Sequence, residues 1–153
     1  MTGWQPGDVQ SCVEMVTDYR KRRSSGAAEK IRFDGAGERD VYNITAPFMD
    51  EGEAVIAGRV ERRDSEESEV WFFVRRGETW VPRGGAPAFR LQDPFVTRIG
   101  GELIFGGVET YPHPETPGAL GWRTVFYRGA NVADLRLFFK GPDQMKDLRL
   151  VEI

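Results

Sequence analysis

The sequence predicts an all-β fold, an incomplete β-propeller of about two blades plus one strand, preceded by one helix. Two observations support this prediction. Asp40, Asp93 and Asp147 stand 53 and 54 residues apart, and each opens an apolar run that favours β-structure. The runs that follow repeat as well, because residues 54–61 resemble residues 102–109. Strands that recur with a period of about 50 residues are typical of a propeller with one four-stranded blade per repeat.

The first part of the chain, residues 1–29, is predicted to be a helical segment. Apolar side chains recur at helical spacing from Val9 to Tyr19, and Asp8 is a suitable N-cap, so we expect a helix over residues 8–22. From residue 30 onward, short apolar runs are broken by glycine, proline and aspartate, which indicates strands. The expected strands are 30–33, 41–46, 53–60, 69–75, 79–81, 88–90, 95–99, 102–108, 123–127, 135–139 and 148–152.

Residues 30–153 would therefore form the partial propeller domain. Two blades and one strand cannot close a ring, so the sequence is expected to be the front part of a longer propeller. In such a fragment the last expected strand, 148–152, would be an unpaired edge, and unpaired edges favour pairing with another chain.

The composition excludes several classes of partner and site. The 153 residues include 21 basic and 24 acidic side chains, so a net charge of −3 indicates neither a nucleic-acid nor an acidic-membrane partner. Cys12 is the only cysteine and His113 the only histidine, so neither a disulfide nor a metal site is predicted. No nucleotide-binding glycine motif is present, and no cofactor is expected. Without a visible signal peptide or membrane span, the predicted location is the cytoplasm.

The three spaced aspartates are the first candidates for chemistry. The first strand of each blade lines the central channel of a propeller, so Asp40, Asp93 and Asp147 would project toward one funnel mouth. Gathered carboxylates suit glycosyl chemistry, in which one protonates the leaving oxygen while another acts as base or nucleophile. An aspartate at a fixed blade position can equally be a turn residue that accepts backbone N–H bonds in every repeat.

The motif Gln92-Asp93-Pro94, together with Asp40 and Asn43 one repeat earlier, resembles the inner-strand acid pattern of five-bladed glycosidase propellers. The sequence is similar to an uncharacterised bacterial family related to glycoside hydrolase family 130, whose members are roughly twice as long. The resemblance covers about residues 30–153 and therefore points to the N-terminal half of such a propeller. The stretches that carry it are 39–47, 56–64, 92–98, 102–109 and 140–149.

The resemblance implies an activity, because family 130 contains mannoside phosphorylases and mannosidases. In these enzymes an aspartate in a second-blade Asp-Pro motif is the proton donor, which implies that Asp93 is the general acid, assisted by Asp40 and Glu109. Inorganic phosphate would be a co-substrate if the reaction is a phosphorolysis. The sequence departs from the enzymes at Phe95, where they usually carry an arginine, and Arg98 follows three residues later.

Further residues are candidates for substrate binding. Arg59 and Arg98 could hold phosphate or a sugar hydroxyl, and Arg59 could equally pair with Glu61 or Asp64 at the surface. His113 lies in a proline-rich loop that could overhang the funnel, and Trp122 beside that loop could stack on a sugar or pack in the core. The remaining candidates are Asn43, Asp147 and Arg149.

These observations predict a carbohydrate-active protein, a glycosidase or mannoside phosphorylase that acts on small glycosides, and a fragment of a longer protein. The alternative is a non-catalytic sugar-binding or structural half-propeller. Such a half-propeller would pair with another chain, either a second copy of itself or the missing C-terminal half.

Overall fold

The computed structural model describes residues 10–22, 30–65 and 67–153, which form two compact units, residues 1–30 and 31–153. The first unit contains one α-helix, α1 (Cys12–Arg22). Ser11 caps it: the Ser11 Oγ accepts a hydrogen bond from the Glu14 N–H at 3.3 Å, and the Ser11 N–H donates to Glu14 Oε2 at 2.8 Å. This reciprocal arrangement is a capping box. The predicted cap, Asp8, lies outside the described residues.

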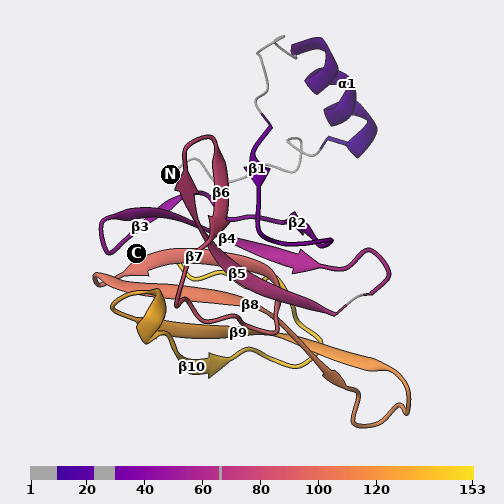
Figure 1. The fold of residues 1–153 in the computed structure, drawn as a ribbon. Coiled ribbons are helices and arrows are strands. Elements are labelled where there is room, and N and C mark those ends of the chain that lie inside the picture. Colours follow the sequence, from indigo (N-terminus) through magenta and orange to yellow (C-terminus); the bar gives the residue numbers. More distant parts are fainter. Residues whose placement is uncertain (1–9, 23–29, 66) are drawn as a thin grey trace. The chain divides into compact units, whose positions relative to one another are not determined.

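The second unit consists of two β-sheets that lie as two layers (Figure 1). The first sheet has the order β1-β6-β5-β4-β2, with β3 also pairing with β4. All its pairs are antiparallel except β1 with β6. Its strands are β1 (Arg32–Phe33), β2 (Asp40–Tyr42), β3 (Phe48–Asp50), β4 (Glu53–Glu61), β5 (Ser68–Arg76) and β6 (Thr79–Pro82).

The second sheet is antiparallel throughout, with the order β10-β9-β8-β7. Its strands are β7 (Gln92–Ile99), β8 (Glu102–Pro112), β9 (Leu120–Gly129) and β10 (Arg136–Lys140). A short 3-10 helix, η2 (Val132–Asp134), connects β9 to β10. The described residues thus form a mostly β structure with one α-helix, as predicted. Two stacked sheets are compatible with two neighbouring blades, and the five-bladed ring stays a prediction.

The main hydrophobic core lies between the two sheets. Val55 and Ala57 of β4 face Leu103 and Phe105 of β8 in this core. Because side chains alternate along a strand, Arg59 lies on the same face of β4 as Val55 and Ala57. The outer face of the first sheet has a second core around Ile56, Val60, Phe73 and Trp80, and the outer face of the second sheet has a third around Phe95, Ile104 and Phe126.

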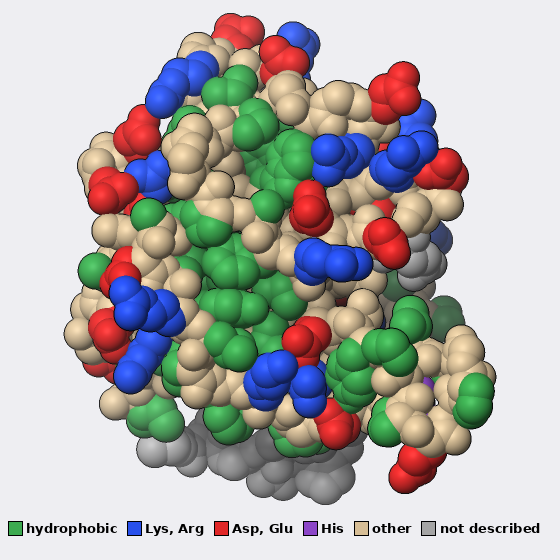
Figure 2. Space-filling model, turned by 60° about the horizontal axis from the view of Figure 1, so that its bottom comes forward, with side chains coloured by type: hydrophobic (Ala, Val, Ile, Leu, Met, Phe, Trp, Pro, Cys, Tyr) green, Lys and Arg blue, Asp and Glu red, His purple; other side chains and the backbone are tan. Residues whose placement is uncertain are grey.

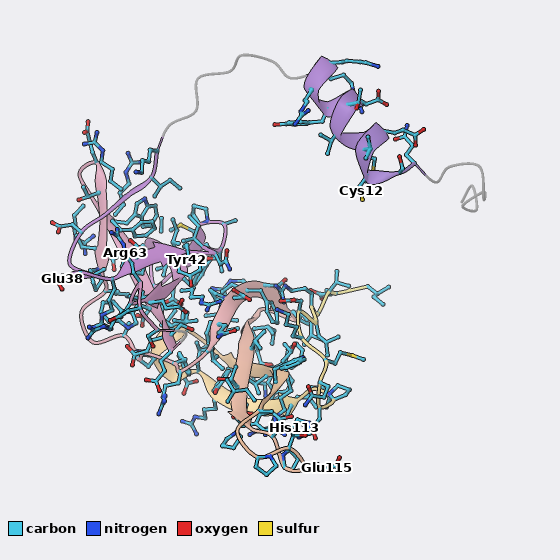
Figure 3. All side chains as sticks on the ribbon, turned by 90° about the vertical axis from the view of Figure 1, so that its right-hand side faces the viewer. Cys12, Glu38, Tyr42, Arg63, His113 and Glu115 are labelled. Atoms are coloured by element: carbon cyan, nitrogen blue, oxygen red, sulfur yellow. The ribbon has the colours of Figure 1, made fainter. Side chains whose placement is uncertain are left out.

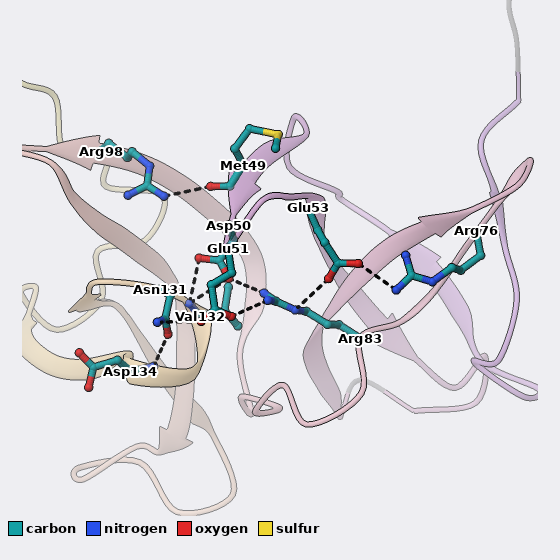
Figure 4. A network of polar contacts seen from close by, with 10 residues as sticks. All are labelled: Met49, Asp50, Glu51, Glu53, Arg76, Arg83, Arg98, Asn131, Val132 and Asp134. Carbon is teal, nitrogen blue, oxygen red and sulfur yellow. Dashed lines mark hydrogen bonds and ion pairs between the residues drawn. The ribbon is translucent and has the colours of Figure 1, made fainter.

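A buried carboxylate of the first sheet, Asp50, forms an ion pair within that sheet and a hydrogen bond to the segment after β9 of the second sheet (Figure 4). Asp50, at the end of β3, is only 1% exposed. Its carboxylate accepts a hydrogen bond from the Val132 backbone N–H of η2 at 3.2 Å and pairs with Arg83, which follows β6. Arg83 also donates to Glu51 at 2.7 Å. Arg83 and the Val132 N–H compensate the buried charge of Asp50. The hydrogen bond from Val132 therefore connects the two sheets without leaving a buried carboxylate unpaired.

Two strand predictions are not matched by the structure. Residues 148–152 were expected to form a strand, and this prediction is wrong. The Leu148 N–H donates to the Thr124 side chain, and Leu148 and Leu150 pack on the outer face of the second sheet instead of beside its edge. The expected strand 88–90 is reduced to a single bridge between Phe89 and Val70. No helix in the described part of the chain is long and apolar enough to cross a membrane.

Candidate functional site

Two of the five described non-glycine residues with positive φ lie in the candidate site. Asn43, just after β2, has φ 45°, and Asp93, in the bulge that opens β7, has φ 48°. Positive φ is uncommon outside glycine, and such strain concentrates at functional sites. Asp147 has φ 62°. The residue spacing favours Asp40, 53 residues before Asp93, but the shared positive φ instead matches Asp93 with Asn43, 50 residues before it.

Asp93 is held by donors from the other sheet. Its Oδ1 atom accepts a hydrogen bond from Asn43 Nδ2 at 2.5 Å and one from Arg59 Nη1 at 3.2 Å. The Asp93 side chain is 20% exposed, so the carboxyl group lies close to the surface of the interface between the sheets. Both of these hydrogen bonds fall on Oδ1 rather than on Oδ2.

Arg59 is the centre of this group of side chains. Its Nε and Nη2 atoms donate to Glu61 Oε2 at 2.9 and 2.5 Å, while Nη1 reaches Asp93. Burial opposes the charge of Arg59, but the hydrogen bonds with Glu61 and Asp93 outweigh it and raise the pKa of Arg59 above its ordinary value. Arg59 is therefore a permanent cation between two carboxylates.

Tyr42 completes the group. Its ring lies 5.1 Å from the Arg59 guanidinium carbon, and its hydroxyl donates to Glu61 Oε1 at 2.7 Å. Burial, followed by the hydrogen bond to Glu61, raises the pKa of Tyr42 to about 12. Tyr42 thus stays neutral and remains a donor at physiological pH. We refer to Tyr42, Asn43, Arg59, Glu61 and Asp93 together as the Asp93 cluster.

Asp40 does not join the Asp93 cluster. Its carboxylate binds Arg63 through two hydrogen bonds of 2.8 and 2.9 Å at an exposed position. These bonds hold the pKa of Asp40 below its ordinary value. The predicted role of Asp40 as an assisting carboxylate stays a prediction, and the structure gives the side chain a different partner.

Glu109 belongs to a separate group on the second sheet. It accepts from Arg123 at 2.7 Å and from Lys140 at 3.2 Å. Arg123 also donates to Asp143 at 3.1 Å and lies 4.6 Å from the Tyr111 ring. Burial raises the pKa of Glu109, but the bonds from Arg123 and Lys140 outweigh it and leave the pKa lowered. Glu109 is therefore held as a carboxylate. These five residues form the Glu109 cluster.

Arg98 and His113 lie away from Asp93. Arg98 donates to the backbone oxygen of Met49 at 2.9 Å (Figure 4) and to that of Gly101 at 3.1 Å. It stands five residues along β7 from Asp93, about 16 Å at the usual rise of a strand. His113 lies in the β8–β9 loop, where its Nδ1 accepts from the Glu115 N–H, and Figure 3 shows it well apart from Tyr42. Neither residue contacts the Asp93 cluster.

The other predicted binding residues are distributed over the second sheet. Trp122 on β9 is 39% exposed, so its ring is available for stacking. The Arg149 guanidinium lies 4.7 Å from the Phe95 ring and 4.0 Å from Asp147. Gly106 makes room for Phe95, because a Cβ at Gly106 would collide with that ring. Arg149 therefore supplies a cation close to the Asp93-Pro94-Phe95 bulge.

Sequence reasoning did not select Tyr42 and Glu61 as site residues. The signal was available in the alternation of the strands, because Tyr42 pairs directly with Arg59, and Glu61 is two residues further on the same face. Among the described residues, no group of three or more His, Cys, Asp or Glu side chains could hold a metal ion.

Comparison with known proteins shows the family of the chain. A family model described as a protein of unknown function (DUF1861) matches residues 18–153. The chain belongs to the DUF1861 family. The match includes both sheets and every residue of the Asp93 cluster. No curated protein is similar to the chain.

Solved structures from Leishmania share the fold of this DUF1861 member. The GDP-Man-dependent mannosyltransferase MPT-1 from Leishmania mexicana is 34% identical with a TM-score of 0.83, over 92% of this chain and 45% of that one. The mannose phosphorylase MPT-4 from the same organism, solved in complex with a phosphate ion, is 32% identical with a TM-score of 0.80, over 90% and 42%. A hypothetical protein from Leishmania major is 30% identical with a TM-score of 0.76, over 89% and 44%. The chain spans less than half the length of each.

Proposed function

We propose that this DUF1861 chain is part of a carbohydrate-active enzyme that acts on a small mannoside, with Asp93 as the acid–base residue. The observation that carries the proposal is the position of Asp93, which has a positive φ, contacts Arg59 of the other sheet and keeps 20% of its side chain exposed. Similarity to a mannosyltransferase and a mannose phosphorylase supports mannose as the sugar. The relation to glycoside hydrolase family 130 and the five-bladed ring belong to the same proposal.

The chemistry follows from the two oxygens of Asp93. Asn43 and Arg59 fix Oδ1, so Oδ2 can exchange a proton with the glycosidic oxygen of a bound sugar. When the glycosidic bond breaks, the proton moves from Oδ2 to the leaving oxygen, and the anomeric carbon forms a new bond to an oxygen of phosphate or water.

Phosphate would require cations that are free to bind it. Arg59 is neutralised by Glu61 and Asp93, and Arg98 is bound to two backbone oxygens. Arg149 donates to the Leu148 backbone oxygen at 3.0 Å, lies 4.7 Å from the Phe95 ring and is 4.0 Å from Asp147. Arg149 also lies over Phe95 on the outer face of the second sheet, whereas Asp93 faces the first sheet, so we assign the phosphate contact to neither Arg98 nor Arg149. Because the relatives are more than twice as long, a complete phosphate site would include residues beyond this chain.

The test is turnover on a panel of small mannosides, with and without inorganic phosphate, and with GDP-mannose as a donor. Asp93→Asn removes the proton but keeps the hydrogen-bonding shape, so turnover should fall about 100-fold or more. Asp143→Asn is the matched control, because Asp143 is an exposed carboxylate of the Glu109 cluster. Equal turnover of Asp93→Asn and the wild type would rule out the assigned acid.

A second candidate function is a half-propeller that pairs with another chain. All five residues of β10 are exposed, and Leu137, Phe138 and Phe139 are 46%, 41% and 52% exposed. Figure 2 shows apolar side chains gathered over the middle of the face in view. Absence of turnover on every donor, together with a concentration-dependent oligomer that Phe139→Asp abolishes, would favour this function over the enzyme.

A further inference from the structure

Two side chains of the Asp93 cluster, Tyr42 and Glu61, make no hydrogen bond with Asp93 and contact Arg59 instead. Arg59 uses one nitrogen, Nη1, for Asp93 and the two others, Nε and Nη2, for Glu61. The Arg59 and Glu61 side chains are 11% and 13% exposed, whereas Asp93 is 20% exposed. Glu61 therefore binds the Nε and Nη2 side of the guanidinium group, and Asp93 binds the remaining nitrogen, Nη1.

Glu61 is itself held on both oxygens. Its Oε2 accepts from Arg59, and its Oε1 accepts from the Tyr42 hydroxyl at 2.7 Å. Tyr42 pairs with Arg59 across β2 and β4, and its ring contacts the guanidinium group. The three side chains thus form a closed set of contacts on the first sheet, and only Nη1 of Arg59 points out of it toward the second sheet.

We propose that Glu61 and Tyr42 are positioning residues for Asp93. An arginine side chain has several rotatable bonds, and fixing it in one geometry costs conformational entropy. The contacts with Glu61 and Tyr42 already fix the Arg59 side chain in the folded protein. Arg59 therefore presents Nη1 at a fixed place before any ligand binds. Arg59 then holds Asp93 Oδ1 and leaves Oδ2 for the sugar. The catalytic part of this inference rests on the proposed function, but the positioning itself does not.

The charge of the cluster supports the same role. Two carboxylates share one arginine, so Arg59 would be left with Asp93 alone if Glu61 were removed. Glu61 takes up two of the three guanidinium nitrogens that make contacts, which fixes the plane of the group. A lysine could not replace this arrangement, because its single nitrogen has no such plane.

The experiment measures hydrogen exchange of the Arg59 Nε–H by NMR on the full chain. In Glu61→Gln the charge-assisted bond is lost, and the exchange rate should rise about tenfold or more. Tyr42→Phe keeps the ring but loses the bond to Glu61, and the rise should be about threefold. Glu69→Gln is the matched control, because Glu69 holds Arg39 and the Trp71 N–H outside the cluster. Its effect on Arg59 should stay within about twofold.

An unchanged Arg59 exchange rate in Glu61→Gln, or an equal rise in Glu69→Gln, would overturn the proposal. If Glu61→Gln does not fold, Tyr42→Phe decides alone, with an unchanged rate as the contradicting result. The amide spectrum of each variant shows whether the fold is kept.

Turnover tests the link to catalysis separately. On any mannoside that the wild type converts, Glu61→Gln should lower kcat about tenfold with KM unchanged, and Glu61→Asp should restore part of kcat. A raised KM with unchanged kcat would mean that Glu61 contacts the substrate, which contradicts a positioning role. If the wild type has no turnover, the proposed function fails, and the exchange rates still decide whether Glu61 positions Arg59.

Discussion

The Asp93 cluster and the Glu109 cluster are built from nearly the same parts. Each has an arginine against a tyrosine ring, and each arginine joins one glutamate and one aspartate. They differ in what they connect. Arg59 joins two sheets, whereas Arg123 of β9 joins β8 to the segment after β10.

The Asp93 cluster is also more buried than the Glu109 cluster. The Arg59 and Asp93 side chains are 11% and 20% exposed, and those of Arg123 and Asp143 are 25% and 66% exposed. An ion pair that is mostly removed from water is costly to break, while an exposed pair contributes little. Residue composition therefore does not distinguish the two clusters, whereas strand position and burial do.

The largest expected difference is in stability. Arg59→Met would leave Glu61 and Asp93 largely buried without their cation, and we expect a loss of about 3 kcal/mol in the free energy of unfolding. Arg123→Met should cost about 1 kcal/mol or less, because its partners reach water. Urea unfolding of both variants measures this difference. Equal losses would remove the distinction between the clusters.

The second prediction concerns pH, because the pKa of Tyr42 is raised to about 12. In the unfolded chain Tyr42 ionises at about pH 10, so its contribution to stability is complete below that pH. The contribution should then be lost as the pH rises from about 10 to 12. Tyr42→Phe should make stability less dependent on pH in this window. Tyrosine absorbance near 295 nm gives the titration, and a wild-type curve that matches Tyr42→Phe would contradict the assigned contact.

The smallest expected effect concerns backbone conformation, which differs between Asn43 of the Asp93 cluster and Glu109 of the Glu109 cluster. Asn43 has φ 45°, a region where glycine is tolerated, so Asn43→Ala should be less stable than Asn43→Gly by about 1 kcal/mol. Glu109 lies within β8, where glycine is unfavourable, so Glu109→Gly should be less stable than Glu109→Ala by about 0.5–1 kcal/mol. Thermal unfolding of the four variants measures both pairs. If the alanine variant were the more stable one at both positions, the positive φ of Asn43 would have no effect on stability.

Much of the fold was predictable from the sequence, because the repeat spacing and the alternation of apolar residues are local signals. They predicted a mostly β chain with one α-helix. They also put an aspartate at the start of an apolar run in each repeat. The strand expected at 148–152 failed for a tertiary reason: Leu148 and Leu150 pack on the face of the second sheet, and no pattern along the chain distinguishes a face from an edge.

The candidate site was predictable only in part. The Asp-Pro motif singled out Asp93, but matching aspartate to aspartate selected Asp40 as its counterpart. The backbone conformation instead matches Asp93 with Asn43, three residues later. The contact between Asn43 and Asp93 joins residues 50 positions apart, and its hydrogen bond depends on how the two sheets stack. Side-chain alternation could have added Tyr42 and Glu61, because both share a face with Arg59.

The central claim is that the Asp93 cluster binds the sugar, and one measurement tests it most directly. The chain has two asparagines: Asn43 donates to Asp93, and Asn131 donates to Glu51 in the network around Asp50. Their side-chain amide signals can therefore be followed separately by NMR while mannose is added to the full chain. The account predicts saturable shifts of the Asn43 amide with the Asn131 amide unchanged. An Asn43 signal that stays in place at saturating mannose, or one that moves no more than the Asn131 signal, would contradict it.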